Sequence, residues 1–366
     1  MTFQTIARGY RNFALLFLNT VLIGAVIGSI VFLVVRFKTS KLPENPIEKY
    51  GITALEGGFA GHTTNEIATL IKEAWERPFI YEAYTQFSES PCTGRFVNVS
   101  QAGFRLVQNA GPWPPEPHRI NVFVFGGSTT FGYGVTDIET IPSVLQQKLR
   151  ASSSKQVCVY NFGRGFYYST QERILFSNLL VAGIIPELAI FIDGLNEFYR
   201  FQDTPQFSSY FMGLINQNFL ESRGVEQIRV SDIVRKSSSP MAPRDEATAR
   251  KICERYLRNT ELTEAMARAK GVKTLFVWQP VSVYKFDRKF HPFSNTSLDF
   301  FAGLGYAQMA QWRKSDGPAA QVLWLADMQE NAREQLYCDS VHYTAKMCGQ
   351  IAEEIARFIR AQSLMK

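Results

Sequence analysis

Histidine and cysteine are scarce in this sequence of 366 residues, which contains four His and five Cys. Five cysteines are too few for a disulfide scaffold, and the sequence leaves open whether Cys338 and Cys348 form a bridge. No spacing of Cys and His resembles a metal site, and four histidines supply few ligands for a metal cluster. We therefore expect neither a metal ion nor any other cofactor.

The sequence also has little net charge outside its N-terminal segment. The formal net charge is +6, and residues 1–49 contribute +4 of it through six Lys or Arg and two Glu. Of the 39 basic and 33 acidic residues, 33 and 31 lie beyond residue 49. No basic stripe with interleaved aromatic residues occurs, so we expect no nucleic acid partner.

Charge is absent from one long stretch, Phe13–Val35, whose polar residues are Asn19, Thr20 and Ser29. About 20 apolar residues span a bilayer, so this stretch predicts a transmembrane helix over about residues 13–35. A cleaved signal peptide is the alternative, but its apolar region would comprise about 7–15 residues. Basic residues flank the stretch on both sides, and the positive-inside rule therefore does not orient it.

A Gly-x-x-x-Gly spacing, formed by Gly24 and Gly28, lies inside the predicted transmembrane helix. Two such glycines can seat a second helix, which would give a helix–helix dimer in the membrane. The simpler interpretation is two small residues that face lipid. The sequence does not decide between them.

Residues 1–41 comprise the predicted N-terminal tail and anchor. The rest of the chain divides into two parts. Residues 42–118 begin with a segment rich in Gly and Pro, 43–61, and we interpret them as a linker and a membrane-proximal extension. Residues 119–366 alternate between strand-like and helix-like patterns. Strands are expected at 120–125, 157–161, 187–192, 273–278 and 322–326, and helices at about 138–150, 170–182, 246–269, 297–313 and 344–362.

This alternation predicts an α/β domain, a three-layer αβα sandwich in which helices cover both faces of a parallel sheet. Residues 200–245 interrupt the alternation with aromatic residues that have no clean period. We interpret them as an insertion, either a lid over the site or a passive surface excursion.

Two short motifs carry reactive groups. The first, Gly-Gly-Ser-Thr-Thr-Phe-Gly at 126–132, directly follows a strand and places Ser128 in a glycine-rich turn. The second is Asp339-Ser340-Val341-His342, in which one turn delivers a base and the acid that orients it. Serine acyl-transfer chemistry needs a nucleophile, a general base and an orienting carboxylate, for which the candidates are Ser128, His342 and Asp339.

Together with Asp193-Gly194-Leu195-Asn196-Glu197, which follows the strand at 187–192, these motifs resemble the blocks of the SGNH hydrolases, also called GDSL-type esterases. The resemblance covers roughly residues 119–362 in the family's order. It implies a flavodoxin-like fold with a five-stranded parallel sheet and an acyl-enzyme on Ser128. It also implies oxyanion donors from the Ser128 backbone, the Asn196 side chain and a glycine block.

The glycine block departs from the family pattern. It reads Asn-Phe-Gly-Arg-Gly-Phe-Tyr at 161–167, with Phe166 where the family has the oxyanion glycine and Gly165 one place earlier. Because glycine tolerates the wider range of backbone angles, we predict the Gly165 N–H as the donor and keep the Phe166 N–H as the alternative.

By resemblance, the function would be that of a carboxylic ester hydrolase acting on O-acyl esters of a cell-envelope polysaccharide or lipid. An O-acyltransferase using the same site is one alternative, and a membrane-anchored scaffold disabled by the altered glycine block is another. Similar anchored members act on envelope polymers. The resemblance therefore implies a single-pass protein of a bacterial inner membrane, with the catalytic domain in the periplasm or outside.

Overall fold

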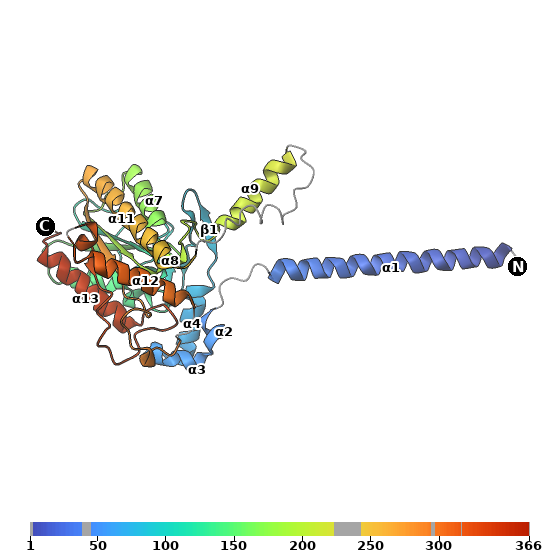
Figure 1. Ribbon diagram of the computed structural model, residues 1–366, viewed down its shortest axis with the longest axis horizontal. Coiled ribbons are helices and arrows are strands. Elements are labelled where there is room, and N and C mark those ends of the chain that lie inside the picture. The colour runs from blue at the N-terminus through green and yellow to red at the C-terminus, as the bar shows by residue number, and fades with distance from the viewer. Residues whose placement is uncertain (1–2, 39–44, 223–242, 294–296, 316, 366) are drawn as a thin grey trace. The chain divides into compact units, whose positions relative to one another are not determined.

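The computed structural model describes residues 3–38, 45–222, 243–293, 297–315 and 317–365 (Figure 1). It divides into two compact units, residues 1–44 and residues 45–366. The predicted extension from residue 45 onward therefore belongs to the same unit as the sheet. Residues 42–44 of the predicted linker lie outside the described residues.

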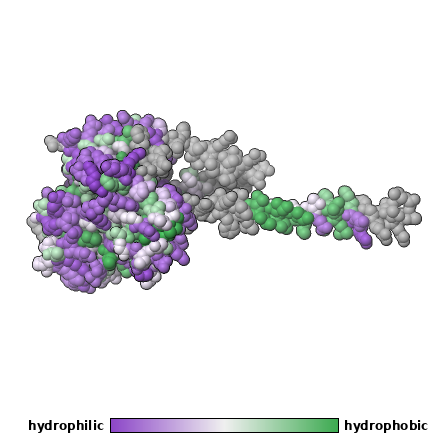
Figure 2. All heavy atoms as spheres, turned by 90° about the horizontal axis from the view of Figure 1, so that it is seen from below, coloured by the Kyte–Doolittle hydropathy of each residue, from purple (hydrophilic) through white to green (hydrophobic). Residues whose placement is uncertain are grey.

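The first unit is a single helix, α1 (Phe3–Lys38). Its segment Arg11–Phe32 is long and apolar enough to cross a membrane, and none of that segment is buried against protein. Figure 2 shows apolar residues gathered along the described part of this helix. The predicted span of 13–35 lies within α1, and a Cβ at Gly24 or Gly28 would meet nothing within 4 Å.

The second unit is built on a parallel sheet of five strands in the order β6-β5-β7-β8-β9. Numbered from the first strand of the sheet, this is the 2-1-3-4-5 order of flavodoxin-like folds. The strands are β5 (Ile120–Gly126), β6 (Val157–Gly163), β7 (Leu188–Asp193), β8 (Lys273–Trp278) and β9 (Leu323–Trp324). The five predicted strands are confirmed, and β9 is shorter than expected.

Helices cover both faces of this sheet, as the sequence predicted. Helices α6 (Ile141–Arg150) and α13 (Ala345–Ala361) pack on the face that carries Val122 and Val124. Helix α7 (Ser169–Val181) packs on the opposite face, which carries Phe123 and Phe125, and α11 (Glu246–Ala269) lies beside it (Figure 1). All seven residues of β5 are buried, as expected for a strand covered on both faces.

Side-chain caps fix where several helices begin. The Asp245 carboxylate accepts the Thr248 N–H at the start of α11, and the Thr344 hydroxyl accepts the Met347 N–H at the start of α13. Helix α11 has the predicted bounds, and α12 (Ser297–Trp312) ends one residue earlier than predicted.

The extension folds as short helices and strands ahead of the sheet. It comprises α2 (Pro46–Tyr50), α3 (Ile52–Leu55), α4 (Thr64–Trp75), β1 (Phe79–Glu82), β2 (Gln86–Glu89), β3 (Cys92–Thr93) and β4 (Asn98–Val99). Much of the predicted linker 43–61 is thus helical. The reason is local, since the Asn45 side chain accepts the Ile47 and Glu48 N–H groups and proline occupies the first position of α2.

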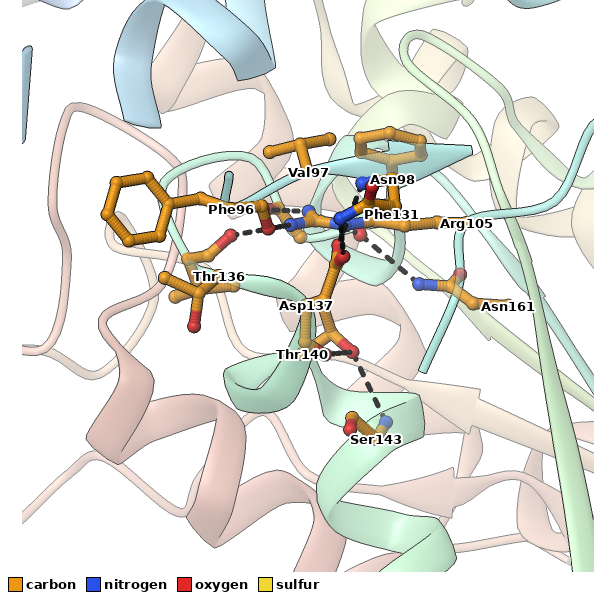
Figure 3. A network of polar contacts seen from close by, with 12 residues as sticks. Phe96, Val97, Asn98, Arg105, Phe131, Thr136, Asp137, Thr140, Ser143 and Asn161 are labelled. Atoms are coloured by element: carbon orange, nitrogen blue, oxygen red, sulfur yellow. Dashed lines mark hydrogen bonds and ion pairs between the residues drawn. The ribbon is translucent and has the colours of Figure 1, made fainter. Parts of the chain in front are cut away.

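A buried arginine joins the extension to the chain that follows Ser128 (Figure 3). The Arg105 guanidinium is fully buried and donates to the Asp137 carboxylate at 2.8 Å. It also donates to backbone carbonyl oxygens that lie 2.7–3.3 Å away, those of Phe96, Phe131, Gly132 and Val135. One side chain thus holds the loop between α5 (Ser128–Phe131) and α6.

Replacing Arg105 by Met is expected to lower the free energy of unfolding by about 3–5 kcal/mol. The partly buried carboxylate of Asp137 and the four carbonyl oxygens would lose a charged donor, and removing one partner from a buried hydrogen-bonded network is costly. Urea unfolding measures the change. The matched control is Arg268→Met, which removes an exposed ion pair with Glu264 and is expected to cost no more than about 0.5 kcal/mol.

Helix α8 (Leu195–Tyr199) ends just before the predicted insertion. The insertion contains α9 (Ser208–Ser222), and its residues 223–242 lie outside the described residues. Near the start of α9, the Phe207 ring lies 5.0 Å from that of Phe87, and the Ser208 hydroxyl accepts a hydrogen bond from Gln86 at 2.8 Å. This end of α9 is therefore attached to the hairpin of β1 and β2. A lid role for the insertion stays a prediction.

Candidate active site

Ser128 lies where β5 ends and α5 begins, at the carboxyl edge of the sheet. The two residues before it must be small. Gly126 has a φ of +155°, and a Cβ there would clash with the Thr130 side chain. A Cβ at Gly127 would clash with the Asn196 amide. Gly126 and Gly127 thus let the serine approach its neighbours closely.

The side chains of Ser128, His342 and Asp339 form one hydrogen-bonded row. His342 Nε2 lies 2.9 Å from Ser128 Oγ, and His342 Nδ1 lies 2.6 Å from Asp339 Oδ2. The other carboxylate oxygen, Oδ1, accepts the backbone N–H groups of Val341 at 2.8 Å and His342 at 2.7 Å. The structure therefore brings together three predicted residues from opposite ends of the catalytic domain.

The electrostatics of Asp339 favour the ionised form. Burial by itself would raise the pKa of this carboxyl, but His342 and the two backbone donors lower it below its usual value. An ionised Asp339 favours the imidazole tautomer with its proton on Nδ1. Nε2 is then left to accept the proton of Ser128.

Two aromatic rings enclose His342, and neither was singled out in the sequence. The Tyr133 ring is stacked on the imidazole at 5.4 Å and 21°, and Trp75 meets it edge-on at 5.4 Å and 89°. Trp75 is the last residue of α4 and so belongs to the extension. Sequence reasoning could not find it, because the contact joins positions that lie far apart along the chain.

Asn196 sits in α8, directly beyond β7, as the resemblance implies. Its Nδ2 donates to the Tyr167 carbonyl oxygen at 2.6 Å, and it lies against Gly127. The neighbouring Glu197, given no role from sequence, is fully buried. It accepts the Ser169 N–H at 2.7 Å and pairs with Arg255 at 3.2 Å, and so ties α8 to the start of α7 and to α11.

The glycine block forms a turn at Arg164–Tyr167, closed by a hydrogen bond from the Tyr167 N–H to the Arg164 carbonyl oxygen at 3.3 Å. The Gly165 N–H, our predicted oxyanion donor, donates to Glu89 Oε1 at 2.8 Å. Phe166 has a φ of +64°, in the left-handed region that favours glycine. Within the described part of the chain, no acceptor is found for the N–H groups of Phe166 and Ser128. This geometry favours Phe166, and the choice of Gly165 stays an untested prediction.

All five cysteines are free thiols in the structure. The bridge between Cys338 and Cys348 that the sequence left open is therefore not formed here. The Cys338 thiol is buried and donates to the His342 carbonyl oxygen at 3.4 Å. This contact supports the loop that carries His342.

Comparison with known proteins finds similarity in structure only. No family model matches the sequence, and no curated protein is similar to it. A member of the lipolytic protein G-D-S-L family from Veillonella parvula is 11% identical with a TM-score of 0.38, covering 66% of this chain and 98% of that one. The psychrotrophic esterase EstA from Pseudoalteromonas sp. is 13% identical with a TM-score of 0.36, covering 66% and 98%. The lipase/acylhydrolase from Enterococcus faecalis is 14% identical with a TM-score of 0.35, covering 66% and 96%.

The strand order and the positions of the blocks are observed directly in the structure of this chain. Ser128 and Asn196 follow neighbouring strands at one edge of the sheet, and the turn Asp339–His342 reaches the same edge. The protein therefore has a sheet with the 2-1-3-4-5 order of flavodoxin-like folds, and Ser128, Asn196 and the turn Asp339–His342 meet at one edge of it.

Proposed function

We propose that this protein is a serine esterase that hydrolyses carboxylic esters through an acyl-enzyme on Ser128. The observation that carries the proposal is the row of hydrogen bonds from Ser128 Oγ through His342 to Asp339, with distances of 2.9 and 2.6 Å. A serine hydroxyl so paired is activated as a nucleophile, because the imidazole can accept its proton.

The reaction follows from these positions. Ser128 Oγ attacks the ester carbonyl carbon as its proton passes to His342 Nε2, and the carbonyl oxygen becomes an oxyanion. The Ser128 N–H, the second proton on Asn196 Nδ2 and the Phe166 N–H are the donors proposed to bind it. The bond to the leaving alcohol then breaks, and the alcohol takes the proton from Nε2. Water repeats the sequence on the acyl-enzyme and releases the carboxylic acid.

The test is release of p-nitrophenol from p-nitrophenyl acetate by the purified full chain in detergent. An esterase is expected to turn over continuously in buffer alone. An O-acyltransferase that uses the same site would release a single equivalent until a sugar or alcohol acceptor is added. No release above that from the detergent buffer would favour the disabled scaffold.

We propose an acylated carbohydrate or lipid of the cell envelope as substrate. The support is the apolar segment Arg11–Phe32, which would hold the catalytic unit close to a membrane surface.

In a bacterial host, we expect the full chain to stay in the membrane pellet after alkaline carbonate extraction, because a spanning helix is not removed by high pH. The catalytic unit is expected to be digested by protease in spheroplasts but not in intact cells. A cytoplasmic protein followed in the same samples serves as the control for lysis. Protection of the catalytic unit in spheroplasts would contradict the proposed periplasmic orientation.

A further inference from the structure

The hairpin of β1 and β2 lies against the turn Arg164–Tyr167 that carries the proposed oxyanion donor. This hairpin belongs to the extension and lies outside the four blocks. Each of the four turn residues contacts a different hairpin residue: Arg164 contacts Glu82, Gly165 contacts Glu89, Phe166 contacts Phe79, and Tyr167 contacts Phe87.

These contacts are of several kinds. Glu82 accepts from the Arg164 guanidinium, at 2.5 Å to one carboxylate oxygen and 3.1 Å to the other. The Phe79 and Phe166 ring centroids lie 6.0 Å apart. The Tyr167 hydroxyl donates to the Phe87 carbonyl oxygen. Of the four hairpin residues, only Glu89 accepts a backbone N–H of the turn, that of Gly165.

The turn needs holding because Phe166 is in a strained conformation. A φ of +64° is a genuine outlier for a bulky side chain, and such residues persist only where the surroundings fix them. In a turn of this kind, the position with positive φ is usually glycine. The N–H of Phe166 and the N–H of Gly165 belong to adjacent peptide groups, so the orientation of one limits the orientation of the other.

Glu89 is well suited to fix that orientation. It is buried, with 1% of its surface exposed. One oxygen accepts the Gly165 N–H at 2.8 Å and lies 3.4 Å from the Tyr133 hydroxyl, and the other pairs with Arg77 at 2.8 Å. Because Arg77 neutralises the carboxylate, Glu89 brings little net negative charge to a place where an oxyanion must be stabilised.

We propose that Glu89 is a positioning residue of the oxyanion hole. By accepting the Gly165 N–H, it keeps the turn in the conformation that directs the Phe166 N–H toward the acyl oxygen of the ester. This inference rests on the proposed function and assigns part of the catalytic geometry to the extension.

The experiment compares Glu89→Gln with Glu89→Ala in the full chain, with p-nitrophenyl acetate as substrate. Both variants leave Arg77 without its carboxylate, so both are expected to lower the melting temperature. Only Gln keeps an oxygen that can accept the Gly165 N–H. We expect Glu89→Ala to lower kcat about 30-fold or more, with KM changed less than about threefold, and Glu89→Gln to stay within about fivefold of the wild type.

The matched control is Glu73→Ala. Glu73 also belongs to the extension, and its carboxylate accepts the backbone N–H groups of Arg95, Phe96 and Val97 at 2.8–3.0 Å, away from the turn. Its loss is expected to lower the melting temperature while leaving kcat within about twofold of the wild type. The positioning role is overturned if Glu89→Gln loses as much kcat as Glu89→Ala, or if Glu89→Ala behaves like Glu73→Ala.

A double-mutant cycle with Phe166→Gly tests the reason for the effect. Glycine reaches a positive φ without strain, so the turn should depend less on Glu89 in that background. We expect Glu89→Ala to cost at least fivefold less in kcat when combined with Phe166→Gly than when made alone. Independent, multiplying losses would contradict the proposal.

The failure of this inference is distinguishable from failure of the proposed function. If Ser128 is not the nucleophile, hydrolysis will be as fast in Ser128→Ala as in the wild type, and the positioning role is then overturned together with the proposed function. If hydrolysis depends on Ser128 but not on Glu89, the esterase stands and the positioning role is wrong.

Discussion

Replacing Ser128 by Ala is expected to lower kcat for ester hydrolysis by about 10⁵- to 10⁶-fold, because the attacking atom itself is lost. The fold should remain, since the only hydrogen bond recorded for the Ser128 hydroxyl within the described residues is the one to His342. The measurement is steady-state hydrolysis of p-nitrophenyl acetate, with circular dichroism to check folding. A fluorophosphonate is expected to label the wild type at Ser128 and to leave Ser128→Ala unlabelled.

The companion variant His342→Ala tests whether the three residues act as a unit. Mutations of residues that act together lower kcat in a strongly non-additive way. The double variant Ser128→Ala/His342→Ala should therefore be scarcely slower than Ser128→Ala alone. Losses that multiply would contradict the proposed triad, as would fluorophosphonate labelling at another serine.

The central sheet was predictable because its signals are local and repeated. Each of β5, β6 and β7 is a short apolar run bounded by turn residues, and a parallel strand covered on both faces reads as a continuous apolar run. The bounds of α11 were predictable because Asp245 begins it with a strong N-cap.

The extension was much less predictable. Its strands have two to four residues each, too few to show a period. Arg105 and Glu89 have charged side chains that usually face solvent, yet both are buried. Their partners, Asp137 and Gly165, lie more than 30 residues away along the chain, and nothing in the local sequence marks such contacts.

The residues of the candidate site also divide into those that a local motif marks and those that it does not. Ser128, Asn196, Asp339 and His342 could be predicted because each lies in a motif with a fixed spacing. The oxyanion donor of the glycine block was harder, since the sequence rule that glycine takes unusual backbone angles pointed to Gly165. In the structure Phe166 adopts the positive φ, which a single-residue propensity does not anticipate.

The oxyanion hole provides the second large expected effect. Asn196→Ala removes a side-chain donor and is expected to lower kcat about 10²- to 10³-fold, with little change in KM, because the donor acts on charge that develops in the transition state. Loss of the hydrogen bond to the Tyr167 carbonyl oxygen could also loosen the turn, so melting temperature is measured alongside kcat.

Phe166→Gly is the matched variant, because it keeps the backbone N–H and removes only the side chain. If that N–H is the donor, turnover should be retained or improved, since glycine holds a φ near +64° without strain. Gly165→Ala should lose activity on either assignment, because a Cβ there would lie 2.8 Å from the Tyr133 hydroxyl and 3.3 Å from Glu89. Phe166→Gly is therefore the variant that distinguishes the two candidate donors, the N–H groups of Gly165 and Phe166. A large loss of turnover in Phe166→Gly would argue against the Phe166 N–H as an oxyanion donor held in place by the extension. Unchanged hydrolysis in all three variants would mean that the oxyanion is stabilised elsewhere, and the SGNH-type mechanism would then be wrong for this protein.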